Sequence, residues 1–248
     1  MSVTIKTVSS VKDFKPSARF GNRLYKGNRY YVPSMPMDDL STFSKEKNAA
    51  FEFSDAEFYL AYKDGEVVGR VAAIINHKAN EAWKVKQVRF GWIDFIDDME
   101  VSAALLDAVI EFGRKAGMTQ IVGPLGFTDF APEGMLVDGY DRPGTMALIY
   151  THPYYPEHMK KHGYYKETGW VEYRITIPEE MPEKHAKYAE LIKQRYNLKV
   201  RKLTRRQIKK ERYGHKLFQL INETYCVLYG YSLLSEKQID QYVDMYLG

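Results

Sequence analysis

The stretch FGWIDFIDDMEVSAALL, residues 90–106, decides the fold of this chain. Its first half lies in the run VRFGWIDF, whose β-branched and aromatic residues predict a buried strand over residues 87–95. Its second half begins a helix, because apolar residues then recur at helical spacing, at Val101, Leu105, Ala108, Val109 and Phe112. A strand therefore passes directly into a helix, and the first turn of that helix is acidic.

A second strand follows this helix closely. Arg114, Lys115 and Gly117 form a typical helix end, and TQIV at residues 119–122 predicts a buried strand. Strand, helix and strand within about thirty residues predict a right-handed crossover that joins two parallel strands.

The segments before the junction predict antiparallel strands. EFYLAY at residues 57–62 and EVVGRVAAII at residues 66–75 are joined by Lys63, Asp64 and Gly65, and Asp-Gly is a strong hairpin signal. A short strand over residues 3–8 and a helix capped by Ser9 or Ser10 precede this hairpin. Residues 28–48 are expected to form a loop with one helical turn, because their prolines exclude a continuous helix.

The segments after the junction predict further strands and helices. We expect a short strand over residues 145–150, a helix opened by Pro156 and closed by Gly163, and a strand over residues 171–177, VEYRITI. After a linker at residues 178–182 come an amphipathic helix, a strand over residues 198–203 and two more helices. The order strand, Ser or Thr, helix opens both residue 3 onward and residue 198 onward, which indicates the start of a repeated unit.

This order of elements predicts an α/β fold with a mixed, largely antiparallel central sheet flanked by helices. We expect one domain over residues 1–178, a linker and helix over residues 179–197, and the start of an incomplete second domain over residues 198–248. Residues 198–248 would bury little core by themselves, so we expect them to pack on the first domain or on another chain. A homo-oligomer is therefore possible.

The composition indicates the cellular compartment and argues against disulfide and metal chemistry. The chain has no long apolar run, and its N-terminus lacks the order of a secretory signal, so a cytoplasmic protein with no membrane partner is expected. The single cysteine, Cys226, supplies neither an internal disulfide nor a metal cluster. His158 and His162 have a spacing that can grip a metal ion, but no third ligand is evident. We therefore expect solvent-facing histidines and no metal site.

The net charge of +4 is unevenly distributed. Residues 184–216 contain thirteen Lys or Arg and two Glu, a local balance of +11, so the rest of the chain sums to −7. Such a segment can bind a polyanion by neutralising phosphates. Its charges, however, lie on amphipathic helices with an apolar face, and no aromatic RNA-binding signature interleaves with them. A solvated outer face is therefore expected, and nucleic acid is not an expected partner.

Five motifs carry a resemblance to a known superfamily. They are NRYYVPS at residues 28–34, GRVAAIINH at 69–77, GPLGF at 123–127, GMLVDGYDRP at 134–143 and HPYYPEHMKKHGY at 152–164. With the order of elements over residues 3–177, they resemble a bacterial GNAT-like family within the superfamily of acyl-CoA N-acyltransferases, whose longer members continue into a second GNAT-like domain. The resemblance implies acetyl-CoA or another acyl-CoA as cofactor and a small-molecule or peptide amine as acceptor.

In working GNAT enzymes, a loop of the form R/Q-x-x-G-x-G/A wraps the cofactor's pyrophosphate at the helix N-terminus. Aligning the helix core puts Asp97, Glu100 and Ser102 at these positions, and only the serine suits a phosphate. Asp97 and Glu100 have the spacing of a capping box, which predicts that the chain satisfies its own helix end. An amine or metal site at these acids is the alternative. A carboxylate ~5 Å from a phosphate costs about a hundredfold in affinity at an effective dielectric of about 20.

The resemblance also implies cofactor-binding residues and a proton donor. The ligand is expected in the groove between the strands around Phe90 and Ile121, which makes Phe90, Gly91, Trp92 and Ser102 the candidate cofactor-binding residues. Many GNAT enzymes protonate the departing thiolate with a tyrosine four residues before a Gly-aromatic pair. Counting back from Gly163 gives Met159, whose thioether cannot donate a proton.

Four residues are candidates for the catalytic roles. Tyr154 and Tyr155, one turn before Met159, can replace the missing tyrosine, with core packing or pocket lining as the alternative. Asp129 and Glu133 lie near the C-terminal end of the strand at residues 119–122, where ligands of open α/β sheets bind. A carboxylate there can act as general base towards an amine. Ordinary turn chemistry is the alternative explanation for the acids of the insert at residues 123–153.

Two functions remain open from the sequence. The first is an acyl-CoA-dependent N-acyltransferase that transfers an acetyl group to an amine, with an acid or tyrosine of the insert handling protons. The second is a non-catalytic GNAT-like module that binds a ligand or partner and has a degenerate CoA site. Neither the acceptor nor the acyl group follows from the residues.

Overall fold

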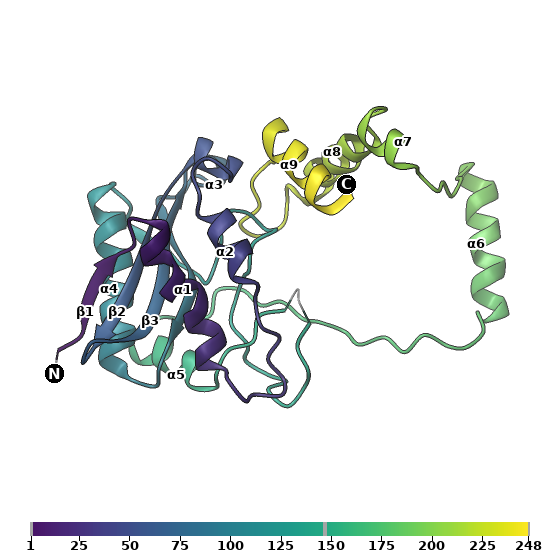
Figure 1. The fold of residues 1–248 in the computed structure, drawn as a ribbon. Coiled ribbons are helices and arrows are strands. Elements are labelled where there is room, and N and C mark those ends of the chain that lie inside the picture. The colour runs from purple at the N-terminus through teal and green to yellow at the C-terminus, as the bar shows by residue number, and fades with distance from the viewer. Residues whose placement is uncertain (1, 146–147, 248) are drawn as a thin grey trace.

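The computed structural model describes residues 2–145 and 148–247, and its centre is a five-stranded sheet (Figure 1). In spatial order the strands are β1 (Thr4–Thr7), β2 (Ser54–Lys63), β3 (Glu66–Asn76), β4 (Gln87–Phe95) and β5 (Gln120–Val122). Neighbouring strands are antiparallel from β1 to β4, whereas β4 and β5 are parallel. The predicted mixed, largely antiparallel sheet is confirmed.

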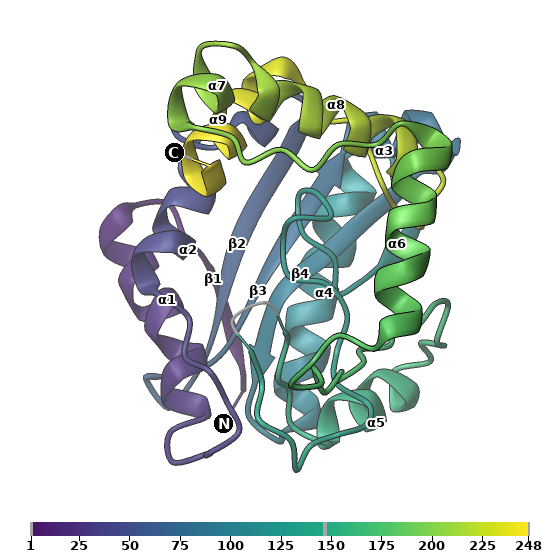
Figure 2. The same cartoon turned by 90° about the vertical axis from the view of Figure 1, so that its right-hand side faces the viewer.

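Helices cover both faces of this sheet (Figures 1 and 2). On one face lie α4 (Met99–Lys115) and α5 (Tyr154–Lys161); on the other lie α1 (Val11–Leu24), α2 (Pro36–Thr42) and the 3-10 helix η1 (Ala49–Glu52). The remaining helices are α3 (His77–Trp83), α6 (Glu183–Tyr196), α7 (Arg205–Lys209), α8 (Tyr213–Tyr225) and α9 (Glu236–Leu247). None of the helices formed by the described residues combines the length and the apolar character needed to cross a membrane.

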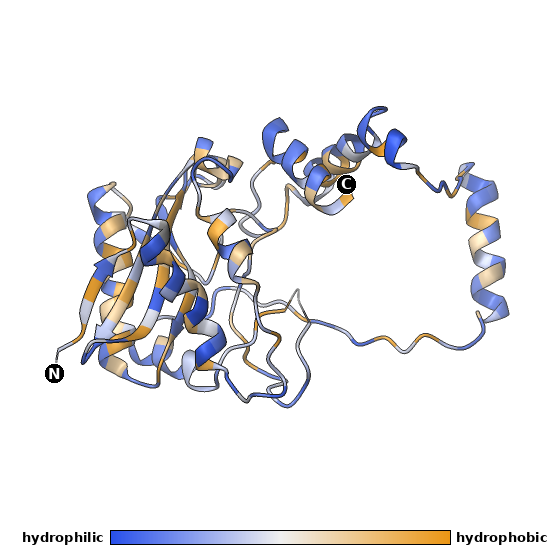
Figure 3. Ribbon diagram, viewed as in Figure 1, coloured by the Kyte–Doolittle hydropathy of each residue, from blue (hydrophilic) through white to orange (hydrophobic). Residues whose placement is uncertain are grey.

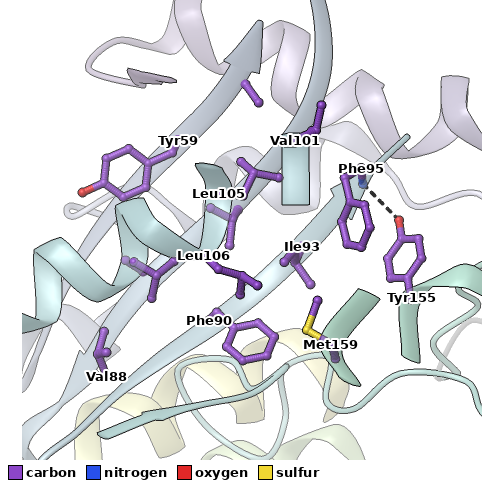
Figure 4. Packing of buried hydrophobic residues seen from close by; sticks show 14 of the residues in the cluster. Tyr59, Val88, Phe90, Ile93, Phe95, Val101, Leu105, Leu106, Tyr155 and Met159 are labelled. Carbon is purple, nitrogen blue, oxygen red and sulfur yellow. Dashed lines mark hydrogen bonds between the residues drawn. The ribbon is translucent and has the colours of Figure 1, made fainter. Parts of the chain in front are cut away.

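A larger and a smaller hydrophobic core lie on the two faces of the sheet. In the larger one, β4 packs against α4 and α5 (Figure 4), through Phe90, Ile93, Phe95, Val101, Leu105, Leu106, Tyr155 and Met159. In the smaller one, α1 packs on the opposite face through Phe14 and Ala18. Successive residues of β3 alternate between the two cores, so this central strand is buried on both sides.

An extra residue in β4 changes which of its side chains face the larger core. Ala72 pairs with Gly91 and Arg70 pairs with Asp94, so β4 has one more residue than β3 between these pairs. Trp92 takes a positive φ of 45° there, as in a β-bulge. The bulge brings Arg70 and Asp94 opposite each other across the two strands.

The C-terminal helices lie against the end of the sheet, and they were expected to pack on the preceding part of the chain or on another chain. α7, α8 and α9 share a small core of Phe218, Leu234, Ile239 and Val243. Hydrogen bonds then fix the segment before α9 to the end of the sheet, from Trp83 Nε1 to Tyr231 O at 2.8 Å and from Arg89 Nη2 to Gly230 O at 3.0 Å. The boundaries of the three predicted domains stay predictions.

Two predicted strands are wrong. Residues 171–177 and 198–203 are largely exposed and form no strand. Strand backbone needs hydrogen bonds from a neighbouring strand, and no described strand lies against either segment. At residues 145–150 no strand occurs at the described positions, and residues 146–147 lie outside them. Conversely, α3 is a helix that the sequence did not predict; Asn76 caps it by accepting a hydrogen bond from Ala79 N at 2.8 Å.

Candidate functional site

The N-terminus of α4, where the resemblance places phosphate, is held by side chains of the chain itself. Asp98 is the N-cap and accepts a hydrogen bond from Glu100 N at 2.9 Å. Lys63 Nζ donates to Asp98 Oδ2 at 2.7 Å and to Glu100 Oε2 at 3.2 Å, and these bonds lower the pKa of both carboxyl groups. The predicted capping box of Asp97 and Glu100 is wrong. The N-cap is Asp98, Asp97 contacts His158, and the Glu100 carboxylate accepts from Val3 N and Lys63 Nζ.

Ser102, a candidate cofactor-binding residue, is buried beneath α5. Its Oγ lies 2.8 Å from His158 Nδ1 and 2.8 Å from His162 Nε2. His158 also contacts Asp97 Oδ1 through Nε2 at 2.9 Å, and its side chain is 4% exposed. The expectation of a solvent-facing His158 is therefore wrong, since α5 turns it onto the start of α4. No group of three or more His, Cys, Asp or Glu side chains in residues 2–145 and 148–247 could hold a metal ion.

Phe90, Gly91 and Trp92 lie where β4 meets the segment that follows β5. Leu125 N donates to Phe90 O at 2.9 Å, so the chain stays beside β4 after β5 ends. A Cβ on Gly91 would lie 2.5 Å from Leu125 O, which is why glycine suits this position. The indole of Trp92 packs against the rings of Phe43 and Phe127. Along Phe90 and Gly91, residues 123–126 take the place of the expected open groove.

Asp129 and Glu133 lie beside Arg89, and we call these three residues the carboxylate site. The side chain of Arg89 is buried, and its guanidinium donates to Gly126 O and Gly230 O, each at 3.0 Å. Asp129 Oδ1 is buried and has no hydrogen-bond partner among the described residues. Because Gly230 precedes α9, the carboxylate site lies at the seam between the insert and the C-terminal helices.

Burial gives the carboxylate site unusual proton affinities. Loss of water raises the pKa of Asp129 to about 6, while Arg89 acts in the opposite direction. Loss of water and the charge of Asp129 raise the pKa of Glu133 to about 7. A carboxyl group with a pKa near neutrality exists in both protonation states there, and this is what a general base that must also release its proton requires.

Tyr154 and Tyr155 lie at the other end of β4. Tyr155 is fully buried, and its hydroxyl accepts from Phe95 N and donates to Asp94 Oδ1, each at 3.1 Å (Figure 4 shows the first bond). Tyr154 Oη donates to Phe95 O at 2.6 Å. Burial raises the pKa of both phenols, so both stay protonated at neutral pH. Met159 points into the larger core beside Phe90 (Figure 4).

A buried ion pair supports this tyrosine end of β4. Arg70 Nε donates to Asp94 Oδ2 at 2.8 Å, and Arg70 Nη1 reaches Asp39 Oδ2 at 3.1 Å. The Tyr25 hydroxyl adds a bond to Tyr155 Oη at 3.1 Å. Loss of water raises the pKa of Asp39, with Arg70 acting in the opposite direction. Two carboxylates, one guanidinium and two phenols thus form one buried polar network.

Replacing Tyr155 with phenylalanine should lower the free energy of unfolding by about 1 kcal/mol, because Phe95 N and Asp94 each lose a buried hydrogen-bond partner. Urea denaturation measures this loss. Tyr165, which is 86% exposed, gives the control, and Tyr165→Phe should leave stability unchanged. Equal stabilities for the two variants would contradict the buried network.

The structure divides the four candidate catalytic residues into two pairs. Asp129 and Glu133 share the surroundings of Arg89, whereas Tyr154 and Tyr155 bond residues Phe95 and Asp94. Arg89 and Phe95 are six residues apart on β4, about 20 Å at roughly 3.3 Å per residue. One small substrate group therefore cannot touch both pairs at once.

Sequence reasoning missed Arg89, Arg70 and Asp94. The available signal was a charged residue inside an apolar strand run, as in VRF, VGRV and WIDF. Charged residues are rarely buried unless they are paired, so each of these positions implied a buried partner. The register that supplies Asp94 as the partner of Arg70 appears only in the folded sheet.

The chain is similar to two curated bacterial proteins. It is 28% identical over 162 residues to Protein YghO of Escherichia coli (strain K12), which covers 65% of this chain and 41% of that protein. It is 24% identical over 182 residues to the bacterial ceramide synthase of Caulobacter vibrioides (strain NA1000 / CB15N), covering 73% and 47%. The chain thus spans less than half the length of either relative. No protein-family model matches it.

Among solved structures, the ribosomal-protein-alanine N-acetyltransferase of Brucella melitensis biovar Abortus 2308 overlaps 72% of this chain and 100% of its own, at 12% identity and a TM-score of 0.41. A TM-score of 0.41 means that the two backbones superpose only in part. The fold of this chain therefore follows from the strand order and the strand directions described above. Four antiparallel strands lead through the bulged β4 and the crossover helix α4 into the parallel β5. From β1 to β5 the strands and the crossover helix follow the order predicted from the sequence, and the chain has a GNAT-like α/β fold.

Proposed function

We propose that this chain takes part in acyl-CoA-dependent transfer of an acyl group to an amine, with the carboxylate site as its acid–base centre. In this reaction the amine nitrogen attacks the thioester carbonyl, the carbon–sulfur bond breaks, and the thiolate leaves. The nitrogen loses a proton in forming the amide, and Glu133 or Asp129 accepts it.

The observation that carries this proposal is the pair of raised carboxyl pKa values, about 6 for Asp129 and about 7 for Glu133, at the C-terminal end of β5. Ligands of α/β sheets bind preferentially at such strand ends, and perturbed carboxyl groups cluster at functional sites. Asp129 Oδ1 is buried and has no hydrogen-bond partner among the described residues, so it can accept an N–H from a substrate once the segments that cover it open. Arg89, held by Gly126 O and Gly230 O, lowers the pKa of both acids by its charge but does not cancel the rise that burial causes.

The name of one relative also favours an amine acceptor. A ceramide is the amide of a long-chain amino alcohol, so a ceramide synthase that acts by N-acylation performs this class of reaction. A long-chain amino alcohol is therefore a useful probe, next to shorter amines. The acyl donor to test first is acetyl-CoA.

The alternative function is a non-catalytic GNAT-like module, and the start of α4 favours it. Asp98 and Glu100 fill the expected phosphate position and are held there by Lys63. Ser102 is covered by His158 and His162. A pyrophosphate at that helix would need these side chains to move aside.

A calorimetric titration of the 248-residue chain with acetyl-CoA separates the two functions. Binding is expected at millimolar or lower ligand, together with thiol release when an amine probe is added. The double variant Glu133→Gln/Asp129→Asn should lower the rate of thiol release by about a hundredfold or more, because it removes both proton acceptors. No binding at millimolar acetyl-CoA would end the catalytic proposal for this chain and leave the binding module.

Glu100→Ala tests where the pyrophosphate lies. Glu100 is 51% exposed, so water screens its charge, and its removal should tighten acetyl-CoA binding by about tenfold if the phosphates sit at α4. Glu111→Ala, at the far end of the same helix and equally exposed at 51%, is the control and should leave affinity unchanged. Unchanged affinity in Glu100→Ala would place the phosphates away from the start of α4.

A further inference from the structure

Residues 169–177, GWVEYRITI, have the pattern of a strand; Trp170 packs against the ring of Tyr229, whereas residues 171–177 lie in solvent. Val171, Tyr173, Ile175 and Ile177 alternate with polar residues and are 78% to 85% exposed. In Figure 3 the same coil carries apolar colour as it runs out to α6. An alternating run with no proline inside it is a template for pairing with another strand, and exposed apolar residues in such a row mark an interaction surface.

α6 follows residues 169–177 in the sequence and offers a second exposed apolar surface. Tyr188, Leu191, Ile192 and Tyr196 lie on one side of the helix, are 47% to 61% exposed, and meet no core in the described residues. Figure 1 shows α6 standing away from the sheet. A two-stranded ribbon is marginal by itself but becomes stable when a helix covers it.

We propose that residues 169–177 pair with the same residues of a second copy of this chain, as an antiparallel two-stranded ribbon that the two α6 helices cover. In a two-fold pairing each residue faces a fixed partner, so the charges select the register. Centred on Tyr173, the pairing puts Glu172 opposite Arg174 twice. Val171 then faces Ile175 on the apolar side, and Tyr173 faces its own copy.

The neighbouring register is disfavoured by charge. Centred on Arg174, the pairing places two guanidinium groups directly opposite each other and leaves Glu172 facing Thr176. Like charges directly opposite destabilise an antiparallel pair, whereas opposite charges stabilise it. The sequence of this strand is therefore complementary to itself in one register, which is the property that identifies a second copy as the partner.

Charge reversal tests the pairing. The 248-residue chain should sediment as a dimer, and Glu172→Arg or Arg174→Glu alone should raise the dimer dissociation constant about tenfold or more, because each change breaks two pairs. The double variant Glu172→Arg/Arg174→Glu should restore the dimer. Glu179→Arg, just beyond the strand, is the control and should sediment like the unaltered chain.

Cysteine cross-linking checks the register independently. In a Cys226→Ser background, Tyr173→Cys should form an intermolecular disulfide on oxidation, because the two Tyr173 Cα atoms face each other within disulfide reach. Glu172→Cys should not link to itself, but it should link to Arg174→Cys when the two variants are mixed. A monomer at all concentrations, a dimer indifferent to both single reversals, or equal linking at all three positions would each overturn the proposal.

Discussion

Arg70→Met should lower the free energy of unfolding by about 3 to 5 kcal/mol, the largest effect that we expect from a single substitution in this chain. The side chain of Arg70 is 8% exposed and bonds both Asp94 and Asp39, which are themselves nearly buried. Methionine fills much of the same volume, but it leaves the carboxylates of Asp94 and Asp39 without a cation in the buried interior. Urea denaturation at pH 8 measures the loss.

Two comparisons show whether the unpaired carboxylates cause this loss. The triple variant Arg70→Met/Asp39→Asn/Asp94→Asn should recover part of the stability, because it removes the buried charges together with their cation. Arg70→Met alone should be less damaging at pH 5 than at pH 8, because burial raises the pKa of Asp39 and Arg70 no longer opposes that rise. Arg114→Met, whose ion pair with Glu111 is exposed, should change stability by less than about 0.5 kcal/mol. A similar small effect for Arg70→Met would refute the network.

The second large effect is a dependence of stability on pH that comes from Glu133. Its pKa is about 7 in the folded chain against 4.5 as its ordinary value. The folded state therefore holds the proton more tightly, so the stability that Glu133 contributes is complete below about pH 4.5 and is lost as pH rises through about 7. Allowing for partial exposure, we expect the unaltered chain to lose about 2 to 3 kcal/mol over this window.

Glu133→Gln removes this titration, and its curve of unfolding free energy against pH should be flatter by that amount. Urea denaturation at pH 5 and pH 8 gives both values. Asp129 keeps its own dependence, since its pKa is also raised, so the variant should retain a smaller slope of the same sign. Glu157→Gln, at an exposed position of α5, serves as control. Parallel curves for Glu133→Gln and the unaltered chain would show that Glu133 is not buried as described.

The sheet and most helices could be predicted from local patterns. Asp64 and Gly65 both take positive φ in the turn between β2 and β3, as the Asp-Gly signal requires. Ser10 caps α1 through a hydrogen bond from Asp13 N, as expected. These features depend on residues close together in the chain, and so the sequence contains them. The predicted strand at residues 171–177 was wrong because a strand forms only where another strand lies beside it. That neighbour is not encoded in the local sequence.

The candidate site could be predicted only in part. Asp129 and Glu133 were chosen for their position after β5, and their raised pKa values agree with a proton-transfer role, which stays a proposal. Arg89 was not chosen, because its partner carbonyl Gly230 O lies 141 residues away in the chain. The pairing of Asp97 with His158 was missed for the same reason, as α5 must fold back onto α4 before the two side chains meet.

The acidic start of α4 shows where the two sources of information divide. The sequence by itself determined that a strand runs into a helix, that the first turn of the helix is acidic, and that a methionine stands where a tyrosine donor is expected, because these are properties of adjacent residues. Only the tertiary structure decided that Lys63 pairs with Asp98 and Glu100 and that α5 covers Ser102. It also decided that burial raises the pKa values of Asp129 and Glu133. Charge pairing and the loss of water from a side chain depend on which distant segments of the chain pack together. Those contacts exist only in the folded chain.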